Sequence, residues 1–209
     1  MNPRLYLFAL VNLVIGTGAF VIAGILKPIA DDLQVSIPAT GQAMTTYALA
    51  TALFVPIALV LTGKLSRKRA MQLSLTLFTL GNMVCAFATS LPILLAGRVL
   101  MGIGAMFTPL AAGLGVTMVE PARRGKALAL VFLGVSLAYV VGLPLGAWLG
   151  FKYGWHVPII AIAVASFVAL VAITVLVPED ITGPVSTLRR ADSTTLRRRG
   201  ASTVCKCSA

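Results

Sequence analysis

The sequence predicts an all-α membrane protein: a bundle of six transmembrane helices over residues 1–177, followed by a polar tail over residues 178–209. Composition is the first observation behind this prediction, because 58% of the 209 residues are hydrophobic and only 11% are charged. Soluble domains carry about 45–50% apolar and about 25% charged residues. The second observation is that the apolar residues form long runs, with most of the charges placed between them or in the tail.

Six apolar stretches are each long enough to cross the hydrocarbon core of a bilayer, which takes about 20 residues of helix. They cover residues 5–26, 40–62, 71–90, 92–119, 126–150 and 156–177. Unbroken apolar character favours helices, because strands of a membrane barrel alternate in character over about ten residues. The first stretch exceeds the apolar segment of a signal peptide, about 7–15 residues, so we expect it to be a retained helix.

Basic residues recur in every second loop. Those that follow the second and fourth stretches are Lys64, Arg67, Lys68, Arg69, Arg123, Arg124 and Lys126. Because Lys and Arg concentrate in cytoplasmic loops, we expect both termini to lie in the cytoplasm. This topology also accounts for the net charge of +11, and no zinc-finger, RNP or basic-zipper pattern supports a nucleic-acid partner.

The tail over residues 178–209 is rich in Ser, Thr and Arg and has little apolar periodicity. Such a composition buries too little surface to offset the conformational entropy of an ordered chain. We therefore expect the tail to be disordered and cytoplasmic.

Arg98 is the one charge that falls clearly inside an apolar stretch. Ionisable groups within a membrane are energetically unfavourable and are functional by default, although Arg98 could also extend to the outer interface. Asn12, Tyr47 and Tyr139 are the preferred candidates to line a substrate cavity. For each of them the alternative is a hydrogen bond between helices. No acidic residue lies well inside a stretch, so this sequence offers no evident proton carrier.

Gly142, Gly146 and Gly150 are spaced by four residues, which places them on one helix face where two backbones can approach closely. Pro144 favours a bend at the same place. These residues are either static packing positions or part of a conformational change. Metal, cofactor and enzyme chemistry are not expected. The sequence lacks a second Cys pair, paired carboxylates, a His cluster and a nucleophile elbow.

The loop after the second stretch reads GKLSRKRAMQL, residues 63–73. It is similar to G-x-L-[A/S]-D-R-x-G-R-[R/K], the signature loop of the major facilitator superfamily. Gly63, Leu65 and Ser66 fit this signature, whereas Arg67 replaces its Asp and Ala70 replaces its second Gly. In the family that Asp belongs to a charge cluster controlling closure, so the resemblance assigns Gly63 and Arg67 to conformational gating.

Two further motifs resemble the same family. The fourth stretch reads GRVLMGIGAMF and resembles R-x-x-x-G-x-G, with Arg98, Gly102 and Gly104 in place. In the family this Arg is linked to proton transfer or to a buried hydrogen-bond network. The fifth stretch reads GVSLAYVVGLPLGAWLG and resembles the antiporter motif of efflux members. Its G-x-P-x-G element falls at residues 142–146 and is also expected to take part in gating.

The motifs together are similar to those of the bacterial drug and sugar efflux group, which includes arabinose-efflux-like and purine-efflux-like permeases. The resemblance covers about residues 5–177, although Ala19 stands where many relatives have an acidic residue. That family normally has about twelve spans in two halves, so the resemblance implies an N-terminal half. It implies proton-coupled efflux of a small solute across a bacterial inner membrane, with a homodimer partner or a second half.

The residues after about Pro184 carry no recognised family motif. One hypothesis is therefore a truncated gene product, or a frameshifted one in which this segment is translated out of frame. The alternative function that follows is a membrane fragment or partner subunit that does not itself transport.

Overall fold

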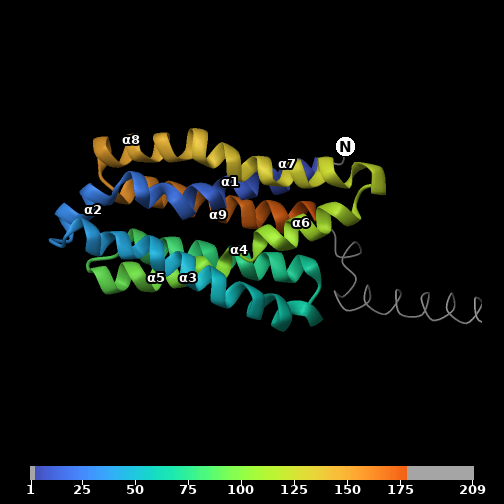
Figure 1. Cartoon of the computed structure of the whole chain (residues 1–209), viewed down its shortest axis with the longest axis horizontal. Helices are drawn as coiled ribbons and strands as arrows, with labels where there is room; N and C mark the ends of the chain where they lie inside the picture. The colour runs from blue at the N-terminus through green and yellow to red at the C-terminus, as the bar shows by residue number, and fades with distance from the viewer. Residues whose placement is uncertain (1–2, 178–209) are drawn as a thin grey trace, which may run out of the picture.

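The computed structural model describes residues 3–177, and all of their regular structure is helical. The first half of this region forms α1 (Pro3–Gly24), α2 (Leu26–Asp32), α3 (Ile37–Leu61), a 3-10 turn (Thr62–Lys64) and α4 (Arg67–Ala86). The second half forms α5 (Leu91–Gly104), α6 (Phe107–Thr117), a 3-10 turn (Pro121–Arg123), α7 (Arg124–Leu137), a π-helical turn (Ala138–Gly142), α8 (Leu143–Tyr153) and α9 (His156–Leu176). The long helices run side by side in one bundle (Figure 1), which confirms the predicted all-α class.

Within residues 3–177, five helical stretches are long and apolar enough to cross a membrane: α1, α3, α5–α6, α7–α8 and α9. The protein is therefore an integral membrane protein. α4, with 20 residues, is the sixth helix of the bundle and packs between α5 and α9. It falls outside that count because its first turn is basic and its interior includes the polar residues Gln72 and Asn82.

The fourth predicted stretch, residues 92–119, is interrupted. α5 ends at Gly104, Ala105 and Met106 form a turn, and α6 begins at Phe107. Pro109 explains the break, because proline lacks the N–H that would bond to the carbonyl four residues earlier, that of Ala105. The expectation of one continuous helix over this stretch was wrong in this respect.

The fifth predicted stretch, residues 126–150, is divided in the same way by Pro144, which cannot donate to Val140. The chain widens there into a π-helical turn, in which the N–H of Leu143 donates to the carbonyl of Ala138. The helical path continues through α8, so the bend expected at Pro144 takes the form of a π-helical turn.

The third predicted stretch, residues 71–90, begins earlier than expected. Arg67 is the first residue of α4 and not a loop residue. Ser66 caps this helix, since its hydroxyl oxygen accepts a hydrogen bond of 3.3 Å from the backbone N–H of Arg69. Three consecutive basic residues are typical of a loop between membrane spans, so hydropathy alone does not indicate that the helix begins this early.

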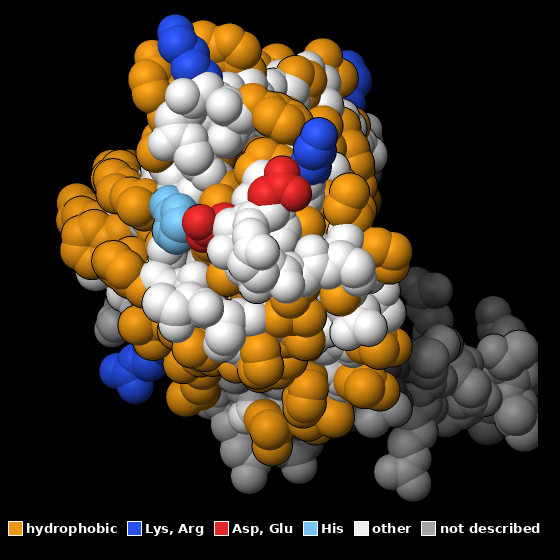
Figure 2. Space-filling model, turned by 90° about the vertical axis from the view of Figure 1, so that its left-hand side faces the viewer, with side chains coloured by type: hydrophobic (Ala, Val, Ile, Leu, Met, Phe, Trp, Pro, Cys, Tyr) orange, Lys and Arg blue, Asp and Glu red, His pale blue; other side chains and the backbone are white. Residues whose placement is uncertain are grey.

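The two ends of the bundle differ in charge. The N-terminus, the α3–α4 link and the α6–α7 link meet at one end (Figure 1). We call it the basic end, and its charged residues include Arg4, Arg67, Lys68, Arg69, Arg123, Arg124 and Lys126. At the opposite end, seen face-on in Figure 2, acidic side chains, the histidine and Lys or Arg side chains lie among apolar ones, so both signs of charge are present. There the indole N–H of Trp155 donates to a carboxylate oxygen of Asp32 over 2.9 Å.

Candidate functional site

Arg98 lies inside the bundle with only 1% of its surface exposed. Its Nη1 donates to two backbone carbonyls of α1, that of Gly18 at 3.0 Å and that of Ala19 at 3.3 Å. Its Nε, also buried, has no hydrogen-bond partner among residues 3–177. The guanidinium stays charged in proteins. The fold therefore holds a cation in the interior that is only partly satisfied, and the side chain does not reach either end of the bundle.

Tyr47 on α3 covers this cation. The Cζ atom of Arg98 lies 5.8 Å from the centroid of the Tyr47 ring, within the range of a cation–π interaction. Tyr47 is partly buried, so the ring separates the guanidinium from the outer surface of the bundle. One turn later, the hydroxyl of Thr51 donates to the backbone carbonyl of Tyr47 over 2.8 Å.

An open hollow of about 620 Å³ lies on the outer side of Tyr47, between α1 and α3. Its lining consists of aromatic, apolar and hydroxyl-bearing residues: Phe20, Met44, Thr45, Tyr47, Ala48, Thr51 and Ala52. The ring of Phe20 also packs on that of Tyr139, with their centroids 4.5 Å apart. Tyr139 belongs to the π-helical turn and is 48% exposed. Arg98, Tyr47 and Tyr139 are thus brought together around one face of the bundle.

Asn12 lies away from this face. It exposes no surface, and its amide Nδ2 donates to the carbonyl of Val131 over 3.2 Å. Its Oδ1 accepts a hydrogen bond of 2.7 Å from the hydroxyl of Thr108. Asn12 therefore links α1, α6 and α7, and in this conformation both ends of its amide are bonded to protein.

Gly102 and Gly104 determine how closely α5 approaches its neighbours. A Cβ atom at Gly102 would lie 2.6 Å from Cβ of Ala50 and 3.0 Å from the carbonyl oxygen of Tyr47. A Cβ atom at Gly104 would lie 2.7 Å from the backbone nitrogen of Phe78. The distances of 2.6 and 2.7 Å are shorter than real Cβ contacts, so only glycine allows the helices to lie this close together. The helix that carries Arg98 is thereby fixed against α3 and α4.

Gly142, Gly146 and Gly150 face α1. Added Cβ atoms at these positions would overlap Thr17, Val21 and Ile25, respectively. These α1 residues are also spaced by four, so the two helices keep one register along the contact. Pro144 is exposed on the other side of α8.

Gly63 and Arg67 lie at the basic end, apart from Arg98. Apart from its chain neighbours, no atom of the described residues lies within 4 Å of a Cβ placed on Gly63, which belongs to the 3-10 turn after α3. Arg67 lines a hollow of about 210 Å³ together with Thr62 of the 3-10 turn and residues of α3 and α6, including Leu59 and Pro109.

Several residues of the site carry no sequence signal. Phe20 is an ordinary apolar residue of a span, and Gly18 and Ala19 take part only through their backbone carbonyls. Periodicity and composition do not distinguish such residues from lipid-facing or core positions.

The fold and this face define the class of the protein: an integral membrane helical bundle with a solute-sized hollow beside a buried arginine. The sequence profile described as "Major Facilitator Superfamily" matches residues 8–204, and the chain belongs to this superfamily. It is a family of transporters, not of enzymes. The matched range also includes most of the segment after Pro184, in which the sequence alone revealed no family motif.

Named relatives agree with this assignment. The chain is 32% identical over 196 residues to the uncharacterized MFS-type transporter YtbD of Bacillus subtilis (strain 168), covering 93% of this chain and 48% of that protein. It is 31% identical over 159 residues to the chloramphenicol efflux pump MT0201 of Mycobacterium tuberculosis (strain CDC 1551 / Oshkosh). This match covers 76% of this chain and 38% of that protein. The chain thus spans about half the length of these curated relatives, or less.

A solved structure of the peptide transporter POT in complex with sulfate has the same fold. Its TM-score is 0.73 at 16% sequence identity, over 96% of this chain and 44% of that one. At this identity the likeness concerns the fold alone.

Proposed function

We propose that this chain forms one half of a secondary transporter that exports a small solute across a bacterial inner membrane. The observation that carries the proposal is the face where Tyr47 covers the buried Arg98 and Phe20 packs on Tyr139. A lipid-facing surface needs only apolar side chains. A solute site needs a few polar groups among apolar ones, and Thr45, Thr51 and the two tyrosines supply them here.

A contrast within the bundle supports this choice of face. On α9, the exposed hollow between Phe167 and Leu176 is lined by apolar side chains alone. That side has the composition expected of a surface in contact with lipid tails. The face between α1 and α3 differs from it in each respect that matters for solute binding: hydroxyl groups, paired aromatic rings and a cation behind them.

A second six-helix unit must supply the opposing wall, because one bundle encloses the hollow on one side only. We propose a second copy of this chain or a separate transporter half, and the double length of the relatives supports this architecture. The basic end would face the cytoplasm, in keeping with the distribution of Lys and Arg. Export would then follow from the two units rocking around the shared cavity.

We also propose that the transport is coupled to protons through the second unit. The carboxylates within residues 3–177 are Asp31, Asp32 and Glu120, and all three lie near helix ends. None of them is placed to carry a proton past the hollow. Arg98 would contribute by holding α1 to α5 through the carbonyls of Gly18 and Ala19.

The test begins with the oligomeric mass of the purified chain, measured by light scattering with correction for detergent. Accumulation of radiolabelled chloramphenicol is then measured in a bacterium that lacks its main efflux pumps. We expect a dimer and a several-fold lower accumulation, and a protonophore should abolish this reduction. Arg98→Met should abolish it as well, whereas Arg69→Gln, which removes an exposed charge at the basic end, should preserve it.

A monomeric chain that leaves accumulation unchanged would contradict transport by this chain alone. That result would favour the alternative of a fragment or partner subunit. An active Arg98→Met variant would instead contradict the role assigned to the buried cation.

A further inference from the structure

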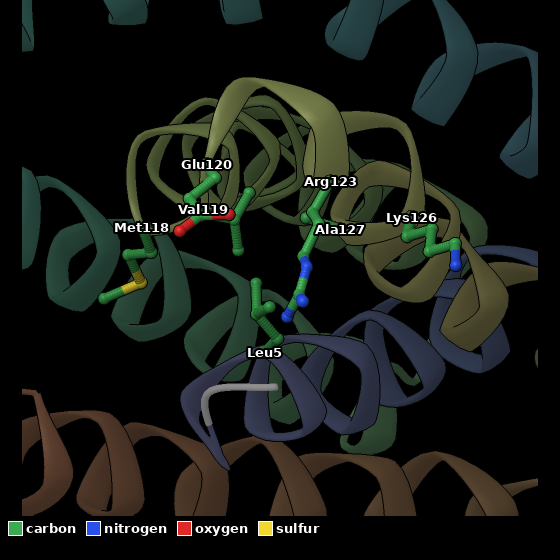
Figure 3. Close-up of a pocket in the computed structure, with 7 residues that line it drawn as sticks. All are labelled: Leu5, Met118, Val119, Glu120, Arg123, Lys126 and Ala127. Carbon is green, nitrogen blue, oxygen red and sulfur yellow. The ribbon is translucent and has the colours of Figure 1, made fainter.

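A groove with charged walls lies at the basic end, where α1, α6 and α7 meet (Figure 3). Its volume is about 350 Å³, and it is lined by Leu5, Met118, Val119, Glu120, Arg123, Lys126 and Ala127. In Figure 3 the guanidinium of Arg123 points into the hollow towards Leu5, and Glu120 lies on the other side. The proposed transport function assigns no role to this groove.

We propose that this groove binds the headgroup of an anionic phospholipid. The inference requires only that the bundle lies in a membrane, and it does not depend on the transport function. Charge is the first argument for it: Arg123 and Lys126 outnumber Glu120, so the lining carries one net positive charge. That charge complements the single negative charge of a lipid phosphodiester. Basic pockets between helices at a membrane surface are a recurrent way of holding anionic headgroups.

The second argument is that the cations of the groove lack acidic compensation in the first turn of α7. Arg123, Arg124 and Lys126 crowd the start of this helix, where the macrodipole disfavours positive charge. All three side chains are exposed, so they are free to turn towards an anion. A bound phosphate would offset both their mutual repulsion and their interaction with the dipole.

The third argument identifies the source of the phosphate. The lining includes two buried apolar residues, Leu5 and Ala127, and two partly buried ones, Met118 and Val119. An inorganic phosphate would gain nothing from this apolar surface, whereas a lipid places its glycerol and the first acyl carbons against it. The residues that line the groove lie at the ends of α1, α6 and α7, the level at which headgroups lie.

The experiment titrates phosphatidylglycerol, and separately phosphatidylcholine, into the purified full chain in detergent and counts the lipids retained by native mass spectrometry. We expect the wild-type chain to retain one phosphatidylglycerol at concentrations where phosphatidylcholine is lost. The paired substitution Arg123→Gln and Lys126→Gln should weaken retention by about tenfold or more, since each juxtamembrane charge contributes about 1 kcal/mol. Glu120→Gln should strengthen it by a few fold.

The matched control is the paired substitution Lys68→Gln and Arg69→Gln. It removes the same charge from the same end of the bundle but outside the groove. We expect it to change retention by less than about twofold. The thermal midpoint of each variant shows whether the bundle is still folded, and all these side chains are at least partly exposed, so we expect it to be.

Two results would overturn the proposal. An equal loss of retention in both paired variants would show that diffuse surface charge, and not the groove, attracts the lipid. Displacement of phosphatidylglycerol by an equal concentration of inorganic phosphate would show a site for free anions in place of a lipid site.

Discussion

Among the helix contacts that depend on glycine, two differ in what faces the glycine. Where α5 crosses α4, a Cβ on Gly104 would meet the main chain of Phe78. Where α1 runs beside α8, a Cβ on Gly146 or Gly150 would meet the side chains of Val21 or Ile25. A main chain moves aside only if its whole helix moves, whereas a side chain can be shortened or turned. The α5 contact is therefore rigid and the α8 contact adjustable.

The same distinction divides the α7–α8 span into two parts. In α7, a Cβ on Gly134 would overlap the backbone carbonyl of Ala9, so this part belongs with the rigid contacts. In α8 the glycines face side chains, and the π-helical turn Ala138–Gly142 lies between the two parts. Pro144 and the π-helical turn thus mark the point where a rigid contact with α1 becomes an adjustable one.

Of three substitutions that test this distinction, Gly104→Ala is expected to have the largest effect. The added methyl would lie within 3.0 Å of three atoms of Phe78, two of them in the main chain, so α4 and α5 would have to separate. We expect the free energy of unfolding to fall by about 3 kcal/mol or more, at the upper end of overpacking effects. Unfolding in mixed micelles of increasing denaturing detergent measures this change. An unchanged midpoint would show that α4 and α5 are not held rigidly together.

A smaller effect is expected from Gly146→Ala, about 1–2 kcal/mol, because its methyl would meet only the side chain of Val21. The second substitution Val21→Ala should restore much of the loss, giving a favourable coupling energy in a double-mutant cycle. The corresponding truncation Phe78→Ala should not rescue Gly104→Ala, since the backbone nitrogen remains in place. Equal rescue at both positions would remove the distinction between rigid and adjustable contacts.

The smallest effect is expected from Gly113→Ala in α6, where no atom lies within 4 Å of the added Cβ. Alanine is favoured over glycine inside a helix by about 0.5–1 kcal/mol, so the substitution should be neutral or slightly stabilising. The same unfolding measurement checks it. A loss comparable with that of Gly146→Ala would mean that glycine matters here for a reason other than contact between helices.

Much of this arrangement could be predicted from the sequence, because spans and close contacts leave local patterns. The four-residue spacing of Gly142, Gly146 and Gly150 indicated a close helix contact. It did not indicate that α1 would be the partner, because Thr17, Val21 and Ile25 look like any apolar face with one hydroxyl. Which helix a face packs against depends on the tertiary fold. The residue pattern of one helix shows only its own side of that contact.

The break within the fourth predicted stretch, residues 92–119, was missed for a different reason. Pro109 lies in an unbroken apolar run, so hydropathy continues across the turn at Ala105 and Met106.

In the site, the charge of Arg98 within an apolar stretch made it a candidate. Its partners, however, are the carbonyls of Gly18 and Ala19. Backbone groups are the same in every residue, so no side-chain pattern could have pointed to them.

The contact between α1 and α7–α8 also affects how the protein is made. α1 is the first of the described helices to leave the ribosome, whereas the helices that cover Asn12 and Thr17 are synthesised much later. Until Thr108 and Val131 arrive, the amide of Asn12 has neither of its final partners. The insertion of α1 therefore depends on its own apolar character, and the mean hydropathy of this span is 2.2. The bundle can close around α1 only once most of the chain has entered the membrane.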